Sequence, residues 1–392
     1  MKKYHFAIDG NEANVSNRVG SNVYAYHIIQ ELSQIVENSE KYEITVLLSS
    51  PPLKDLPKTT KNWQYRVIGP KKFWTQLAAP WHLYTHQYDY HAYYTPGHYA
   101  PRYSVVPYIS SVMDLAFLKF PDQFKKSDLA QLKKWTEYSV KNASKIIAIS
   151  QFTKNELVEN YQVLQNDIIV AEPDVSLPQN PSTKAQLIKY LMKFGIKQPY
   201  FLYIGTLQPR KNLINLITAY EIFCDEQLKK KVQADQLPQL VIGGKVGWMA
   251  DEILARIDNS KHKKTIIITD YVPDIHKPEL YKAALATILV GLYEGFGIPP
   301  LESMHFLTLP IVSSNSSLPE VVGPAGLMVN PHKPSSIADA LSQAYSMPSS
   351  QLKILKEKMV SQRAKFSWTN SAEKIFNALL EVADNNERLN DE

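Results

Sequence analysis

Two glutamates, Glu294 and Glu302, stand at the two ends of a glycine- and proline-rich turn. Residues 294–302 read EGFGIPPLE, after an apolar run and before a helical pattern. The prolines suit a first helical turn, which needs no backbone donor. Gly295 and Gly297 let the backbone approach a ligand closely, and the free amides of a helix start favour a phosphate. The segment predicts two carboxylates at an anion-binding site, although a plain strand–turn–helix connection with solvated glutamates fits it equally well.

A second segment pairs two cations with another expected helix start. Residues 203–212 read YIGTLQPRKN and again follow an apolar strand. Asn212 is a plausible N-cap for the next helix, and Arg210 and Lys211 precede it. Two cations beside the positive end of a helix dipole favour a dianionic group such as a diphosphate. A solvated basic loop explains the segment as well when it is judged alone.

The elements that position these loops alternate between short apolar runs and longer stretches of helical period. This alternation is typical of a parallel α/β fold. We expect two Rossmann-like domains in tandem, residues 1–175 and 176–392, with a candidate linker over Glu172–Pro199. The first set of strands is expected near 4–8, 43–48, 105–111, 144–149 and 167–171, and the second set begins at 200–205. The tail reads as helices over 335–345, 350–364 and 370–384, expected to cross back to the N-terminal domain.

Composition excludes several classes of protein. The chain has 392 residues, of which 44% are hydrophobic, and its net charge is +5, a surplus too small to indicate nucleic-acid binding. The single cysteine, Cys224, excludes a disulfide within the chain or a cysteine-based metal cluster. The sequence shows no signal peptide and no apolar stretch of bilayer length, so we expect a cytoplasmic protein. Contact with the inner face of the cell membrane stays open.

Taken together, the segments resemble the retaining GT-B glycosyltransferases known as family 4, or group 1. Glu294 and Glu302 fit the family's E-x7-E motif in its EGFG-x-P-x-LE form, and 205–212 is similar to its GT-x-x-PRKN diphosphate loop. Weaker likenesses lie at GGKVGW (243–248), YVPD (271–274), LPEVVG (318–323) and IAISQFT (147–153). Each piece is weak, but their order and placement at strand ends make the set specific. The resemblance covers Asp9 to about Trp368 and implies two Rossmann-like domains facing a cleft.

The resemblance also implies a role for each site residue. It implies that Arg210 and Lys211 bind the donor diphosphate, together with the amides of Gly297 and Ile298. It places Gly205 in the diphosphate loop. It assigns Glu302 to the ribose and Glu294, with Asp114, to the transferred sugar. It puts Tyr271 and Val272 beside the base and Gly20 against the donor phosphates from the opposite domain. Family members retain anomeric configuration, so no dedicated nucleophile is required, and no metal or cofactor is implied.

Three positions depart from the family pattern. Met113 precedes Asp114 where a histidine is common, so only Asp114 carries over. Thr206 stands where many members have arginine, although a sizeable subset of the family also has threonine there. The run HFLTLP at 305–310 is one residue longer than the usual segment and lacks its glycine. The first and third departures put catalytic rate and local geometry in doubt.

The stretch Lys71–Tyr103 is rich in tryptophan, tyrosine and histidine. We interpret it as aromatic loops that bind a sugar acceptor, pack, or face a membrane. His82 and His86 have the spacing of helical metal ligands, but no third ligand accompanies them. Lys125, Lys126, Lys133, Lys134 and Lys141, around Trp135 and Tyr138, predict a basic helix whose face is solvated or meets a membrane.

The sequence therefore predicts a metal-independent hexosyltransferase that uses a nucleotide-diphosphate sugar, with mannose as one candidate. Its expected acceptor is a glycan or a lipid-linked glycan in surface polysaccharide synthesis. The alternative from another class is a non-catalytic, glycosyltransferase-like subunit that stabilises a catalytic partner. A dinucleotide oxidoreductase is disfavoured because residues 9–12 (DGNE) lack the G-x-G-x-x-G turn.

Overall fold

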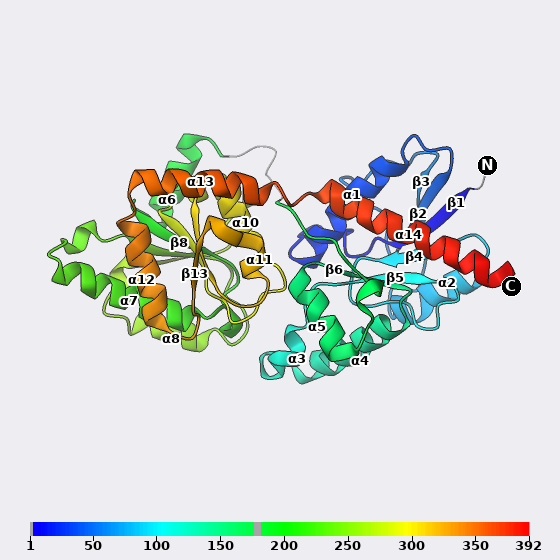
Figure 1. Ribbon diagram of the computed structural model, residues 1–392, viewed down its shortest axis with the longest axis horizontal. Helices are drawn as coiled ribbons and strands as arrows, with labels where there is room; N and C mark the ends of the chain where they lie inside the picture. Colours follow the sequence, from blue (N-terminus) through cyan, green and yellow to red (C-terminus); the bar gives the residue numbers. More distant parts are fainter. Residues whose placement is uncertain (1–2, 176–181, 392) are drawn as a thin grey trace. The chain divides into compact units, whose positions relative to one another are not determined.

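The computed structural model describes residues 3–175 and 182–391. The chain divides into two compact units, Met1–Pro173 with Phe366–Glu392, and Asp174–Lys365. Each unit is a parallel sheet flanked by helices, so the chain is an α/β protein with two Rossmann-like domains (Figure 1).

The first unit contains a seven-stranded sheet of order β3-β2-β1-β4-β5-β6-β7. Every neighbouring pair in it is parallel. The strands are β1 (Tyr4–Asp9), β2 (Tyr42–Leu48), β3 (Trp63–Val67), β4 (Ala92–Thr95), β5 (Tyr108–Val112), β6 (Lys145–Ala148) and β7 (Ile168–Val170). The strand order reverses between β1 and β4, and their carboxyl ends form the crevice where such sheets bind ligands. The loops that follow Asp9 and Thr95 are thus the first unit's natural ligand-binding edge.

Helices cover both faces of this sheet. They are α1 (Ser21–Val36), α2 (Ala79–Thr85), α3 (Ala116–Lys119), α4 (Lys126–Asn142) and α5 (Gln151–Tyr161). The last helix, α14 (Trp368–Asp391), packs on α1 and against β4, although it follows the second unit in sequence. Among the three tail helices only α14 belongs to the first unit, while α12 (Pro334–Tyr345) and α13 (Ser349–Arg363) stay with the second.

The prediction that the stretch Lys71–Tyr103 forms aromatic loops is only partly correct, because it contains the strand β4. Tyr93 and Tyr94 lie on β4 in the centre of the sheet and are fully buried, and Trp74 and Tyr90 are core residues as well. In a parallel sheet with helices on both faces, a central strand is buried on both faces, so its residues form a continuous apolar and aromatic run. The side chains of Trp81, Tyr84 and Tyr103, by contrast, are exposed.

The second unit contains a six-stranded sheet of order β10-β9-β8-β11-β12-β13, again parallel throughout. The strands are β8 (Tyr200–Ile204), β9 (Gln239–Gly243), β10 (Ile266–Thr269), β11 (Ala286–Leu289), β12 (Leu309–Ser313) and β13 (Leu327–Val329). The remaining helices are α6 (Lys184–Phe194), α7 (Leu213–Lys229), α8 (Asp251–Asp258), α9 (Lys277–Ala283), α10 (Ile298–His305) and α11 (Leu318–Val322). Here the order reverses between β8 and β11. The loops after these two strands are the two segments that carry the charged motifs.

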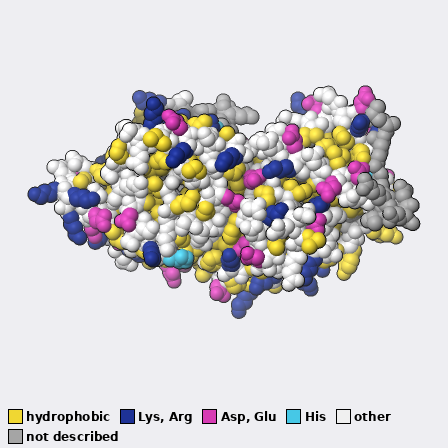
Figure 2. Space-filling model, viewed as in Figure 1, with side chains coloured by type: hydrophobic (Ala, Val, Ile, Leu, Met, Phe, Trp, Pro, Cys, Tyr) yellow, Lys and Arg dark blue, Asp and Glu magenta, His cyan; other side chains and the backbone are white. Residues whose placement is uncertain are grey.

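Charge is spread rather than gathered on the visible surface. On the face drawn in Figure 2, basic and acidic side chains are scattered among hydrophobic ones. None of the helices in the described ranges combines the length and apolar character needed to cross a bilayer.

Asp9, at the carboxyl end of β1, is a buried carboxyl group that should make the stability of the first unit depend on pH. Burial raises the pKa of Asp9 from 3.8 to about 6, even though Asn11 donates two hydrogen bonds to its Oδ1 (2.9 and 2.7 Å). A raised folded-state pKa gives stability that is present below pH 4 and is lost as pH rises through about 6. The difference between these two pKa values corresponds to roughly 3 kcal/mol in the free energy of unfolding.

Asp9→Asn keeps the acceptor and removes the charge. We therefore expect the variant to unfold at a higher temperature than the parent protein at pH 8 and at a similar temperature at pH 4. Thermal unfolding of both proteins across this range measures the difference. A constant difference at all pH values would show that the Asp9 charge is not the cause.

Candidate functional site

The loop after β11 is held in place by a polar segment that follows β12. Ser317 Oγ donates to the carbonyls of Glu294 (2.8 Å) and Phe296 (2.6 Å), and Ser316 Oγ accepts from the Glu294 amide (3.1 Å). Asn315 Nδ2 donates to the Leu292 carbonyl (2.9 Å). Sequence reasoning missed these positioning residues. The run SSNSS at 313–317, which begins at the last residue of a strand, was the available signal.

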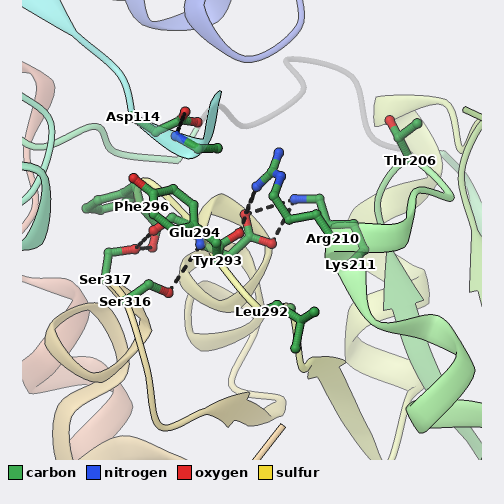
Figure 3. Close-up of polar contacts among 12 residues, drawn as sticks. Asp114, Thr206, Arg210, Lys211, Leu292, Tyr293, Glu294, Phe296, Ser316 and Ser317 are labelled. Atoms are coloured by element: carbon green, nitrogen blue, oxygen red, sulfur yellow. Dashed lines mark hydrogen bonds and ion pairs between the residues drawn. The ribbon is translucent and has the colours of Figure 1, made fainter. Parts of the chain in front are cut away.

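Glu294 is buried, and its carboxylate faces both predicted cations (Figure 3). Both of its carboxylate oxygens lie 2.8 Å from Lys211 Nζ, and Oε2 lies 3.7 Å from Arg210 Nη1. Arg210 Nη1 also donates to the Tyr293 carbonyl (2.7 Å). The structure therefore brings Arg210, Lys211 and Glu294 together. It also shows an ion pair that the sequence did not predict, because Glu294 neutralises Lys211 within the protein itself.

The cationic loop is short and tightly fixed. Arg210 and Lys211 end a 3-10 turn, η4 (Pro209–Lys211), directly before α7. The Leu292 amide donates to the Arg210 carbonyl (2.8 Å), which ties the loop after β8 to the loop after β11. The loops after β8 and β11 are thus joined at the point where the strand order reverses. Parallel sheets bind ligands at such a point, and helix starts bind anions.

Asn212 is the N-cap residue of α7, as the sequence predicted, but its side chain does not cap the helix. Asn212 precedes α7 in the left-handed conformation (φ 60°) and makes no capping hydrogen bond. Its buried amide donates instead to the carbonyls of Val290 (2.9 Å) and Pro331 (2.8 Å). Asparagine tolerates this conformation better than most residues. The Asn212 side chain therefore connects the loop after β8 to the loops after β11 and β13, and it does not bond to the backbone of α7.

Two glycines make room for this arrangement. A Cβ at Gly291 would lie 2.8 Å from Glu294 Oε1, so a side chain there would displace the carboxylate. Gly297 precedes α10 with φ 115°, a conformation that disfavours other residues. Ile298 opens the helix and prolines follow it, as the sequence predicted. The amides of Gly297 and Ile298 thus lie at the helix start proposed for a phosphate.

Glu302, the second carboxylate, is buried on α10. Tyr281 Oη donates to its Oε2 (2.6 Å), and Lys277 Nζ lies 3.3 Å from its Oε1. Lys277 also pairs with Asp274 (2.8 Å). Burial alone would lower the pKa of Lys277, but Glu302 and Asp274 raise it above its ordinary value. Lys277 is therefore held as a cation, and the sequence analysis missed both it and Tyr281.

The unusual segment 305–310 supports this carboxylate. Phe306 stacks on Tyr281 at 5.5 Å between ring centroids, and Thr308 Oγ1 donates to the Tyr281 carbonyl (2.6 Å). Leu307 takes the left-handed conformation (φ 57°) in place of a glycine. The segment keeps a tight turn from α10 into β12 and holds Tyr281 against Glu302.

The residues expected near the base follow β10, and the expected diphosphate glycine follows β8. The Tyr271 ring is partly exposed, with Lys245 Nζ 5.3 Å from its centroid, and Val272 is buried. The Gly205 amide donates to the Gly243 carbonyl (2.9 Å), joining the ends of β8 and β9. The Tyr271 side chain is thus about half exposed, whereas Val272 contributes mainly to packing.

Gly20 and Asp114 belong to the first unit. Gly20 precedes α1 with φ 54°, and no heavy atom lies within 4 Å of a Cβ built on it. Asp114 Oδ1 accepts from the Ala116 amide (3.0 Å) and so also shapes the chain entering α3. Burial lowers the pKa of neighbouring His98, although the Asp114 charge opposes this effect.

The histidine pair is explained by packing. His82 Nε2 lies 3.1 Å from Tyr90 Oη, and the His82 and His86 rings stack at 4.1 Å. Within the described parts of the chain, no group of three or more His, Cys, Asp or Glu side chains is placed to hold a metal ion. Cys224 is buried on α7, and burial raises the pKa of its thiol to about 12.

Comparison with known proteins narrows the interpretation of this geometry. Residues 192–365 match the family of glycosyl transferases group 1. The matched region includes both charged loops and both glutamates. An Escherichia coli relative, O-antigen chain mannosyltransferase B, is 29% identical over 316 residues, which are 80% of this chain and 78% of that protein. These matches support a glycosyltransferase of polysaccharide synthesis.

Two further matches define the extent of the likeness. The E. coli serotype-specific mannosyltransferase WbdA is 28% identical over 236 residues, which are 59% of this chain but 28% of that protein. The crystal structure of HepE from Anabaena in complex with UDP-glucose is 14% identical, with a TM-score of 0.69 over 96% of this chain and 99% of that one. This structural likeness confirms the GT-B fold.

Glu302 and its partners lead to a separate prediction. Glu302→Gln should raise the KM for the donor by about tenfold or more, because a hydrogen bond to a charged group contributes ~1.5–3 kcal/mol. If Glu302 binds the donor ribose, as the family resemblance implies, the change in kcat should be smaller, since that contact would be the same in the ground state and the transition state. Steady-state kinetics measure both constants. Tyr281→Phe removes one support of Glu302 but not its carboxylate, so it should raise KM less. A larger loss in kcat than in KM would contradict a ribose role.

Proposed function

We propose that this protein is a retaining, metal-independent hexosyltransferase that moves a sugar, with mannose as first candidate, from a nucleoside-diphosphate donor to a glycan or lipid-linked acceptor. The observation that supports it most is the Arg210–Lys211–Glu294 cluster at the β8/β11 switch point, beside the start of α10. Cations, helix amides and a carboxylate meet there within one unit. The names of the E. coli relatives support mannose and surface polysaccharide.

In the proposed reaction, the acceptor hydroxyl attacks the anomeric carbon from the side that the diphosphate leaves. The bond from the anomeric carbon to the diphosphate oxygen breaks, and that leaving oxygen takes the acceptor proton. Lys211 and Arg210 stabilise the charge that develops on the diphosphate. Glu294 lies beside the sugar, where positive charge develops. No protein nucleophile takes part.

A nucleotide-sugar screen tests this proposal. Thermal unfolding with GDP-mannose, UDP-glucose and related donors should show stabilisation by one of them, ~2.7 kcal/mol at 100 times its Kd. Transfer should continue in a chelator, and the product should keep the donor's anomeric configuration by NMR. Strict dependence on a divalent metal would overturn the metal-independent site, and an inverted product would overturn retention. Donor binding with neither transfer nor donor hydrolysis would favour the non-catalytic subunit.

A further inference from the structure

The first unit carries an aromatic hollow that the donor chemistry does not use. Its cavity volume is about 490 Å³, within the usual range of small-molecule sites. It is lined by residues of the turn after β3, of the turn η1 (Trp74–Ala78), of α2 and of the segment before β5, among them Gln76, Leu77, Trp81, Tyr84 and Tyr103. None of its lining residues is charged.

The aromatic walls of the hollow remain in water after folding. Trp81 is 69% exposed, Tyr84 57% and Tyr103 83%. Neighbouring aromatics of the same stretch, such as Tyr93 and Trp74, are buried in the core. A cluster of exposed aromatic side chains around a concavity is typical of a binding site rather than of packing.

The backbone around the hollow is also unusual. Residues Trp74–Ala78 form a π-helical turn, η1, a rare conformation that often marks a functional site. Phe73 and Tyr103 take left-handed conformations (φ 59° and 57°), which are strained for aromatic residues. Of these two strained residues, Tyr103 lines the hollow itself.

Tyr103 is fixed from behind by α4. Its amide donates to Tyr138 Oη (2.6 Å), and the two rings meet edge to face at 6.3 Å. Arg102 lies 5.1 Å from the centre of the Tyr138 ring. Because the hydrogen bond holds the Tyr103 backbone, less freedom of this segment remains to be lost when a ligand covers the ring.

We propose that this hollow binds a neutral glycan, namely sugar residues of the acceptor other than the one that receives the new sugar. The inference rests on the proposed function for its choice of ligand. A pyranose ring has an apolar C–H face that packs on an aromatic ring, while its hydroxyls bond to groups such as the Gln76 amide and the tyrosine hydroxyls. An uncharged lining suits an uncharged sugar chain.

The same features argue against a lipid surface as the occupant. Residues that enter a bilayer interface project outward, whereas these aromatics line a concavity. The nearby cations Lys71 and Lys72 lie outside the lining. Binding to an anionic membrane is therefore an outcome that the experiment must distinguish.

Calorimetry with the full chain tests the proposal without relying on activity. Mannopentaose and maltopentaose serve as neutral probes, mannose as the short probe and a sulfated pentasaccharide as the charged one. At least one neutral pentasaccharide should bind about tenfold or more tightly than mannose, a difference of about 1.4 kcal/mol. Trp81→Ala and Tyr103→Ala should each abolish this gain. Tyr88→Ala is the matched control, because Tyr88 is 94% exposed in the same stretch but does not line the hollow.

Each remaining outcome decides the question. Equal binding of short and long probes, an unchanged gain in both variants, or preference for the sulfated probe would overturn the proposal. So would loss of binding to phosphatidylglycerol vesicles in the two variants with glycan binding unchanged. If the pentasaccharide binds at the hollow but no donor is ever transferred, the proposed function fails while the glycan site stands. If a sugar is transferred but the gain is absent, the reverse holds.

Discussion

Glu294→Gln is expected to lower kcat by roughly 10²-fold or more, the range for removing one electrostatic contact to a transition state. In the proposed reaction its carboxylate lies beside the sugar as positive charge develops there. Glutamine has the same shape and lacks the charge. Steady-state kinetics with a single donor, together with calorimetry of the free nucleoside diphosphate, separate turnover from binding.

The ion pair between Glu294 and Lys211 also predicts how Glu294→Gln should change the affinity for a nucleoside diphosphate. In the structure both oxygens of Glu294 lie 2.8 Å from Lys211 Nζ, so the carboxylate would compete with the proposed diphosphate for the same cation. Glu294→Gln should therefore leave nucleoside-diphosphate affinity unchanged or slightly increase it. Glu279→Gln is a suitable control, because Glu279 pairs with Lys282 on the surface of α9. If Glu294→Gln abolished nucleotide binding and Glu302→Gln did not, the two glutamates would have exchanged roles.

Lys211→Ala should weaken nucleoside-diphosphate binding by ~1.5–3 kcal/mol, the range for a charge-assisted hydrogen bond. The physical reason is that Lys211 and Arg210 supply the positive charge at the start of α7, and Arg210 is already bonded to the Tyr293 carbonyl. Calorimetric titration with the free nucleoside diphosphate measures the loss.

A double-mutant cycle separates this effect from damage to the site. Lys211→Ala alone leaves Glu294 buried, with Arg210 Nη1 3.7 Å away as its remaining cation, so some loss of stability is expected. Adding Glu294→Gln removes this buried and only weakly paired charge, so it should restore stability but not nucleotide affinity. If the double variant regained full affinity, Lys211 would act only by neutralising Glu294.

Much of the fold follows from local sequence. The helix α5 (Gln151–Tyr161) begins at a local signal, because Ser150 caps it by accepting from the Thr153 amide. Periodicity and cap chemistry act over a few residues, so they can be interpreted from the chain alone. β3 was missed because Trp63–Val67 is a short edge strand whose residues are mostly exposed. β4 was missed because it lies within an aromatic run whose buried and exposed members look alike in sequence.

For the candidate site, the sequence by itself determined the two loops, the two glutamates and the two cations. Only the tertiary structure decided how they pair. Lys211 and Glu294 are 83 positions apart, and Glu302 lies 21 from Tyr281 and 25 from Lys277. These contacts arise because β8 and β11 are neighbours in the sheet and because α9 and α10 bring their side chains together. Turn chemistry and hydrophobic period specify each loop separately, but no local pattern specifies which buried carboxylate will neutralise which cation.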